Sequence, residues 1–232
     1  MKINQIDKYI SDYIGDFKPS YVTDFNSSFT NKQTDKWNYE DGCVLMGAWQ
    51  LYQATKEEHY KDFILNYVDN AIAEDGVIKE YVEELYNIDS VAPGRVLFFA
   101  YDETGHEKYK KAIEALMQQL RNHPRTKCGN FWHKNIYPNQ IWLDGLYMAQ
   151  PFYMMYETKF NNRENYNDII NQYKNVRKYI YNEDKGLYYH AYDEARVQMW
   201  ADKETGLSPN FWIRSMGWYL MAIIDTIDEM DK

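Results

Sequence analysis

The sequence predicts an all-α protein in which helical hairpins repeat around a ring, that is, a toroid of helices. Apolar residues recur at helical spacing through most of the chain. Broadly apolar helices alternate with amphipathic ones, as expected when inner helices are buried and outer helices are half exposed. Acidic residues also recur near the starts of the apolar helices at intervals of roughly fifty residues, which is the length of one helical hairpin.

Two kinds of helix follow one another along the chain. The amphipathic helices are expected at residues 60–72, 109–120 and 166–181. The broadly apolar helices, expected to be buried on most sides, are at residues 43–54, 91–101, 144–156 and 211–227. No run alternates convincingly enough to predict a long strand, and only residues 188–192, after the turn residue Gly186, form a candidate for a short extended piece.

Acidic residues mark the starts of the buried helices. Asp41, Asp89 and Asp144 each stand at or beside an expected N-cap. Arg214 stands near the start of the last buried helix. In a toroid whose inner helices run parallel, these starts meet at one end, so we expect the four side chains to surround a single funnel. The simpler interpretation, in which each acid only caps its helix, stays open.

Asp144 is the most informative of these acids, because it alone interrupts the apolar and aromatic run of residues 139–149. A carboxyl group beside Trp142 and Leu143 loses water, which raises its pKa toward the range useful for a general acid. A helix N-terminus favours the charged form, whereas desolvation and a nearby Asp89 disfavour it. We predict that the latter two effects win, and that Asp144 is both a helix cap and a proton donor.

Composition narrows the class of protein. The chain has 232 residues, enough for a sizeable core, and we expect one domain over residues 1–232. Its net charge of -9 and the absence of a basic cluster argue against nucleic acid as a partner. The sequence shows no membrane span and no signal peptide, so we expect a cytoplasmic protein without a membrane partner.

Neither a metal nor a cofactor is expected. Cys43 and Cys128 are far apart and offer no disulfide framework, which fits a reducing compartment. His106, His123 and His133 do not combine with Cys128 into a zinc-binding spacing.

Aromatic residues are unusually frequent. The chain has 7 Trp, 23 Tyr and 10 Phe, together 17% of its residues, which is more than a core of this size needs. Tyr and Trp combine a flat apolar face with a polar group, a combination that suits sugar rings. The alternative is a Tyr-rich core and surface that reflect only a composition bias.

Five segments, in order along the chain, carry a resemblance to one enzyme family. They are residues 37–42 (WNYEDG), 86–90 (YNIDS), 131–134 (FWHK), 142–149 (WLDGLYMA) and 211–219 (FWIRSMGWY). The chain resembles the unsaturated rhamnogalacturonyl hydrolases of glycoside hydrolase family 105, relatives of the unsaturated glucuronyl hydrolases of family 88. The resemblance implies an (α/α)6 barrel and removal of the 4,5-unsaturated galacturonyl residue that pectin lyases leave at the non-reducing end of their products.

The chemistry implied by the resemblance needs one proton donor. Such enzymes are thought to hydrate the C4–C5 double bond of the uronate, after which the resulting hemiketal falls apart by itself. Ordinary glycosidases instead place two carboxylates across the scissile bond. At the matching positions Asp144 would be the proton donor and then the base that activates water, with Asp89 as its catalytic neighbour.

The same resemblance implies the residues that bind the small unsaturated oligosaccharide. Arg214 is the best candidate for the uronate carboxylate, because its planar group pairs with both oxygens, and Lys134 is a weaker one. Trp142 and Trp218 would stack on sugar rings. The hydrogen-bonding candidates are His133, His190 and Tyr39. Without the resemblance, the aspartates would be caps, the tryptophans core residues and Arg214 a paired structural arginine.

The chain departs from the family in length. Six hairpins need about 300 residues, and only about four fit here, so we expect an incomplete barrel that lacks its C-terminal part. Such a chain is a fragment or a shortened form whose open edge exposes apolar surface, and a homo-oligomer would cover that edge. Two alternatives to the hydrolase stay open: a sugar-binding member with impaired catalysis, and an unrelated helical-toroid interaction protein.

Overall fold

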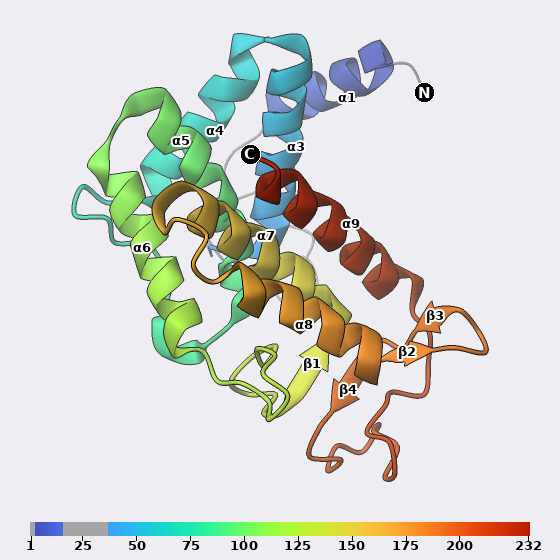
Figure 1. The fold of residues 1–232 in the computed structure, drawn as a ribbon. Helices are drawn as coiled ribbons and strands as arrows, with labels where there is room; N and C mark the ends of the chain where they lie inside the picture. The colour runs from blue at the N-terminus through green and yellow to red at the C-terminus, as the bar shows by residue number, and fades with distance from the viewer. Residues whose placement is uncertain (1–2, 16–36) are drawn as a thin grey trace, which may run out of the picture. The chain divides into compact units, whose positions relative to one another are not determined.

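The computed structural model describes residues 3–15 and 37–232, and it is mostly helical (Figure 1). Its internal contacts divide the chain into two compact units. The first contains the chain up to Tyr81 together with Pro93–Ala115, and the second contains Val82–Ala92 together with Leu116–Lys232. None of the described helices is long and apolar enough to cross a lipid bilayer.

The first unit is built on α1 (Ile3–Gly15), α3 (Tyr39–Thr55), α4 (Glu58–Ala71) and α5 (Arg95–Thr104). Helix α3 packs against α4 and α5. It begins after Asn38, whose side chain accepts hydrogen bonds from the backbone N–H groups of Glu40 and Asp41 and so satisfies two donors of the first helical turn. A Cβ at Gly42 would lie 2.9 Å from the Cα of Pro93, so only glycine fits this contact.

The second unit is organised around α7 (Leu143–Phe160). Every residue of this helix from Leu143 to Glu157 is buried. It packs most extensively against α9 (Ile213–Met230), which lies beside it in Figure 1, and also against α8 (Tyr166–Tyr179). Helix α6 (Glu107–Asn122) contributes its last part to this unit, which also contains the 3₁₀ turns η2 (Glu83–Leu85) and η3 (Ile88–Ser90). A further 3₁₀ turn, η4 (Ala92–Gly94), lies where the chain passes from the second unit into the first.

The second unit also contains two short antiparallel strand pairs. Strand β1 (Gln140–Trp142) pairs with β4 (Ala191–Asp193), with Ile141 opposite Tyr192. Strand β2 (Tyr181–Asn182) pairs with β3 (Leu187–Tyr188) across the turn at Gly186. Because β1 runs directly into α7, its pairing with β4 fixes where the first turn of α7 begins.

The expected helices are present, with differences at their starts. Helix α5 begins at Arg95 instead of residue 91, since the 3₁₀ turn η4, which contains Pro93, precedes it. The prediction that the side chains of Asp41, Asp89 and Asp144 cap their helices is wrong. Asn38 caps α3, Asn87 caps η3, and α7 begins after Trp142 without a side-chain cap.

Helix α9 also differs from its expectation. It was expected to be buried on most sides. In the part of the chain that the structure describes, one face of this helix is exposed to solvent. The exposed apolar side chains on this helix are Ile213, Leu220, Met221, Ile224, Ile227 and Met230.

Candidate active site around Asp144 and Asp89

Most of the predicted site residues belong to the second unit and come from four places in its chain. Asp144 lies in the first turn of α7, and Arg214 lies in the first turn of α9. Asp89 lies in η3, and His190 directly precedes β4. The structure therefore brings together residues that are far apart in the sequence.

Backbone hydrogen bonds join the segments that carry Asp89, His133, Asp144 and His190. The N–H of Ile88 donates to the carbonyl of His133 at 3.4 Å, which ties η3 to the segment before β1. The N–H of His133 donates to the carbonyl of Gln140 at 3.0 Å. The N–H of Leu143 donates to the carbonyl of His190 at 3.1 Å, which places His190 beside the first turn of α7.

Asp144 is buried between a histidine and an arginine. Its Oδ2 lies 3.2 Å from Nε2 of His190, and its Oδ1 lies 3.0 Å from Nη1 of Arg214. The Arg214 side chain is half exposed, so one side of the guanidinium is open to solvent while the other holds the carboxylate. Arg214 has further N–H donors in its planar group, which an incoming carboxylate can use.

The surroundings of Asp144 shift its pKa in the direction opposite to the expected one. Burial alone would raise the pKa, but the hydrogen bond to His190 and the positive charge of Arg214 outweigh that effect, so the pKa of Asp144 lies below its usual value. The prediction that Asp144 keeps its proton near neutral pH is therefore wrong for this state of the protein. Desolvation does raise the pKa as predicted, but His190 and Arg214 lower it by more, so they decide the direction of the net shift.

Asp89 has a separate set of partners. Its Oδ2 lies 2.6 Å from Nζ of Lys134, and its Oδ1 lies 3.5 Å from Nε2 of His133. Lys134 was a candidate for the substrate carboxylate, and in this structure it pairs with Asp89. The expected charge repulsion between Asp89 and Asp144 is not among the largest effects on the pKa of Asp144.

His133 links the two aspartates electrostatically. Burial lowers its pKa, and both Asp89 and Asp144 oppose that effect. A lowered pKa makes the neutral imidazole dominant at neutral pH. Its Nδ1 is buried and has no hydrogen-bond partner among the described residues. His133 is therefore a neutral ring whose Nε2 faces Asp89.

Trp142 holds both histidines in place. Its ring stacks on His133 with centroids 4.8 Å apart and an interplanar angle of 4°, and on Tyr137 at 5.1 Å and 11°. His190 meets it edge-on at 5.4 Å. The indole N–H donates to Oε1 of the buried Gln140 at 3.0 Å, which fixes the ring orientation. Stacking of Trp142 on a sugar stays a prediction, since the ring already stacks on two neighbours.

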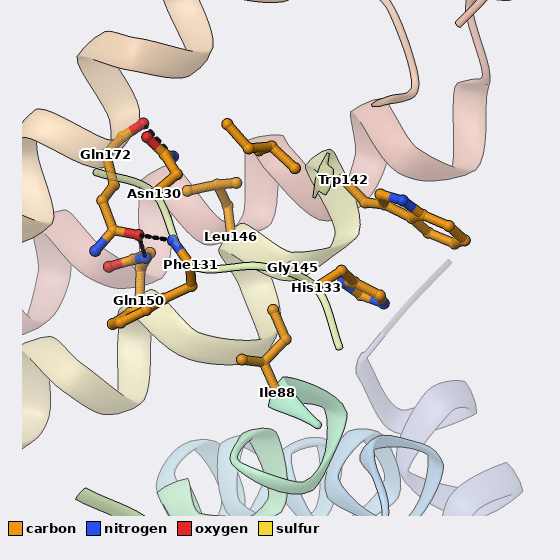
Figure 2. Close-up of a pocket in the computed structure, with 10 residues that line it drawn as sticks. Ile88, Asn130, Phe131, His133, Trp142, Gly145, Leu146, Gln150 and Gln172 are labelled. Atoms are coloured by element: carbon orange, nitrogen blue, oxygen red, sulfur yellow. Dashed lines mark hydrogen bonds between the residues drawn. The ribbon is translucent and has the colours of Figure 1, made fainter. Parts of the chain in front are cut away.

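Gly145 lets α7 approach His133 and η3. A Cβ at this position would lie 2.7 Å from Cδ1 of Ile88 and 3.0 Å from Nδ1 of His133. These three residues line a small cavity of about 10 Å³. In Figure 2, Gln150 and Gln172, which also line it, lie on the side away from His133. Sequence reasoning assigned no role to Gly145, Gln140 or Tyr137, and no sequence signal separates them from ordinary core residues.

The remaining candidates have other contacts in the structure. Trp218 of α9 contacts Tyr147 of α7, with centroids 4.8 Å apart. Tyr39 begins α3 in the first unit, and Asp41 is buried in the same helix, where it accepts a hydrogen bond from Tyr67. A common funnel that includes Asp41, and a role for Tyr39 in substrate binding, stay predictions.

The sequence pattern of Glycosyl Hydrolase Family 88 matches residues 13–232 of the chain. The chain belongs to this family. The match covers the whole of the second unit, and so all of the cluster around Asp144. It also excludes the alternative of an unrelated helical-toroid protein.

Relatives of this family 88 chain agree with that assignment. The unsaturated rhamnogalacturonyl hydrolase YesR of Bacillus subtilis is 27% identical over 193 residues, which is 81% of this chain and 52% of that protein. A family 105 glycoside hydrolase structure from C. acetobutylicum has a TM-score of 0.82 and 47% identity over 91% of this chain and 59% of its own. A Klebsiella pneumoniae structure described as a possible family 105 member has a TM-score of 0.68 and 24% identity, over 84% of this chain and 49% of its own.

These similarities confirm the predicted fold class, the (α/α)6 barrel. The chain spans about half of the length of YesR and about three fifths of the length of the C. acetobutylicum protein.

Proposed function

We propose that this protein removes the 4,5-unsaturated galacturonyl residue from the non-reducing end of small pectin-derived oligosaccharides by adding water across the C4–C5 double bond. Family membership and the similarity to YesR support this class of reaction. The observation that carries the proposal is the ion pair between Asp144 and Arg214, because a uronate brings a carboxylate that competes for the same arginine.

Competition for Arg214 would convert Asp144 from base to acid. Without substrate, Arg214 and His190 keep the pKa of Asp144 low and its carboxylate charged. When a substrate carboxylate binds Arg214, Asp144 shares or loses its cation and gains a negative neighbour in a site shielded from water. Both changes raise its pKa, and burial then favours the protonated form. The proton donor would thus form only when the substrate is bound.

The proposed steps conserve atoms and charge. Asp144 donates its proton to C4, and the positive charge that develops at C5 is shared with the ring oxygen. Water adds at C5 while the Asp144 carboxylate accepts one of its protons, which restores the acid. The product is a hemiketal that opens spontaneously and releases the neighbouring sugar. Asp89, held by Lys134 and facing His133, is positioned to accept hydrogen bonds from substrate hydroxyl groups.

Loss of the ultraviolet absorbance of the double bond tests the proposal. The protein is incubated with an unsaturated galacturonyl-rhamnose disaccharide, and Asp144→Asn is compared with Asp184→Asn, which changes an exposed aspartate in the β2–β3 turn. We expect turnover by the unmodified protein and by Asp184→Asn, and a loss of at least about 100-fold for Asp144→Asn. Equal rates for the two variants would remove Asp144 as the donor, and binding without turnover would instead support a sugar-binding member with impaired catalysis.

A further inference from the structure

Two buried polar side chains at the end of α6 contact the segments that carry Asp89 and His133. Gln119 is 0% exposed and His123 is 4% exposed. They stand four residues apart at the end of one helix, which ends at Asn122, so their side chains lie on the same side of it. Both belong to the second unit, and the proposed reaction assigns a role to neither.

His123 holds the residue that precedes His133. Its Nε2 lies 2.8 Å from the carbonyl oxygen of Trp132. The N–H of Trp132 donates to the carbonyl of Pro124 at 2.9 Å, so both backbone groups of Trp132 are bonded to residues 123 and 124. The imidazole also meets the ring of Phe131 edge-on, with centroids 5.3 Å apart.

The partners of His123 fix its tautomer. Burial is the largest effect on the pKa of His123 and lowers it to about 4, so the ring is neutral at neutral pH. A neutral imidazole has one N–H and one acceptor nitrogen. Because the Trp132 carbonyl can only accept, the proton is on Nε2, and Nδ1 faces Nε2 of Gln119 at 3.5 Å. This last contact is long, so the helix itself keeps the two side chains together.

Gln119 holds the residues that precede Asp89. Its Nε2 donates to the carbonyl of Asn87 at 3.1 Å. The side chain of Asn87 in turn accepts a hydrogen bond from the N–H of Asp89 at 3.1 Å and so caps η3. Tyr86 has φ +40°, a left-handed conformation that costs free energy in a residue other than glycine, and its ring meets His123 edge-on at 5.6 Å. The surroundings therefore hold this segment in a conformation that it would rarely adopt alone.

The direct contacts between the two segments are longer than those made by α6. The N–H of Ile88 donates to the carbonyl of His133 at 3.4 Å, beyond the usual range for such a bond. Oδ1 of Asp89 lies 3.5 Å from Nε2 of His133. The bonds from Gln119 and His123, at 3.1 and 2.8 Å, start from one helix end and reach both segments. A loss of either bond would let the two segments shift relative to each other.

We propose that Gln119 and His123 form a buried bridge that positions Asp89 against His133. They are positioning residues, because they act through the backbone of the segments that they hold. The inference rests on the proposed function, in which Asp89 accepts hydrogen bonds from substrate hydroxyl groups and so orients the sugar ring. The uronate carboxylate is held by Arg214, which is not part of the bridge, so loosening the bridge should lower kcat more than it raises KM.

Three variants test the bridge. His123→Phe keeps a ring of similar size but removes the N–H that donates to the Trp132 carbonyl. Gln119→Leu keeps a side chain of similar size but removes the other bond of the bridge. Tyr109→Phe is the control, because it removes a hydrogen bond of a buried side chain in the first unit, where Tyr109 donates to Asp69 at 2.6 Å.

Amide hydrogen exchange measured by NMR tests the bridge without depending on turnover. In His123→Phe and Gln119→Leu, exchange at the N–H groups of Asp89 and His133 should become about tenfold faster relative to the amides of α8, because these two N–H groups lie in the segments that are loosened. In Tyr109→Phe, exchange at these two groups should change no more than in α8. Equal acceleration across the second unit, or unchanged exchange at Asp89 and His133 in both bridge variants, would overturn the proposal.

Initial rates with the unsaturated galacturonyl-rhamnose disaccharide test the consequence for the reaction. Each bridge variant should lower kcat about tenfold and change KM by less than about threefold, whereas Tyr109→Phe should keep both values. An unchanged kcat, or a loss that appears only in KM, would overturn the positioning role. The two variants break the bridge at different bonds, so if one of them fails to fold the other decides. If the unmodified protein shows no turnover, the proposed function fails, and the exchange pattern still decides whether the bridge holds Asp89 and His133.

Discussion

Asp144 has partners that favour its charged form, although the reaction proposed for it needs the proton. Removing Arg214 takes away a positive charge 3.0 Å from Oδ1, and burial then acts with less opposition. We expect Arg214→Ala to raise the pKa of Asp144. Carbon-13 NMR titration of labelled aspartate, with Asp144→Asn to assign the signal, measures this pKa. An unchanged pKa in Arg214→Ala would show that the arginine does not control the carboxyl group.

Substrate binding should raise the pKa of Asp144, and pH–rate profiles measure this change. The profile of kcat/KM reflects the free protein, whereas that of kcat reflects the complex. Because a proton donor is lost as pH rises past its pKa, and because the pKa of Asp144 is low before binding, kcat/KM should fall at lower pH than kcat. Initial rates measured across pH at low and saturating substrate give both profiles. If kcat/KM and kcat fell at the same pH on the basic side, substrate binding would not raise the pKa of Asp144, and the proposed activation by substrate would be contradicted.

Gly145 gives a prediction for stability. A methyl group there would press on Ile88 and on Nδ1 of His133, in a buried region that has little room to adjust. We expect Gly145→Ala to lower the free energy of unfolding by about 1–3 kcal/mol. Gly217→Ala is the matched control, because a Cβ there meets no atom within 4 Å and alanine favours a helix. Urea denaturation measures both, and equal stability of the two variants would contradict the predicted crowding.

At the scale of elements, a buried amide joins α8 to the segment that leads to the site. Gln172 Oε1 accepts hydrogen bonds from the N–H of Phe131 at 3.1 Å and from Nε2 of Gln150 at 3.0 Å, as Figure 2 shows. Gln172→Leu would leave both buried donors unpaired. We expect a loss of about 2–4 kcal/mol in the free energy of unfolding. Thermal or urea unfolding of this variant beside Gln118→Leu, an exposed change on α6, checks the value, and similar losses in both would contradict it.

The elements that the sequence predicted best are those with long helical periodicity. Helices α4 and α7 were expected within a few residues of their observed bounds, because burial of one face or of the whole helix leaves a clear apolar pattern. Strand β1 was missed, since three residues are too few to show alternation. Asp144 was placed at its helix start from sequence, but its pKa depends on His190 and Arg214, which only tertiary structure brings to it.

At the scale of the molecule, α9 exposes apolar side chains on one face. Leu220, Ile224 and Ile227 lie on one face at helical spacing, and each is more than half exposed. Exposed apolar side chains gathered on one helix face favour association. The sequence predicted a homo-oligomer that covers an open edge, and this face is the one on which we expect the contact.

We therefore predict concentration-dependent self-association through α9. Ile224→Glu places a charge in the middle of the exposed face, where it would be buried without a partner in a dimer. This variant should remain monomeric at concentrations where the unmodified protein associates, while Glu183→Gln, a change in the exposed β2–β3 turn, should associate as before. Light scattering coupled to size-exclusion chromatography gives the molar mass of each species. Because Ile224 is solvent exposed in the single chain, its replacement should alter the free energy of unfolding of the monomer by less than about 0.5 kcal/mol. A monomeric unmodified protein across the accessible concentrations would contradict the prediction.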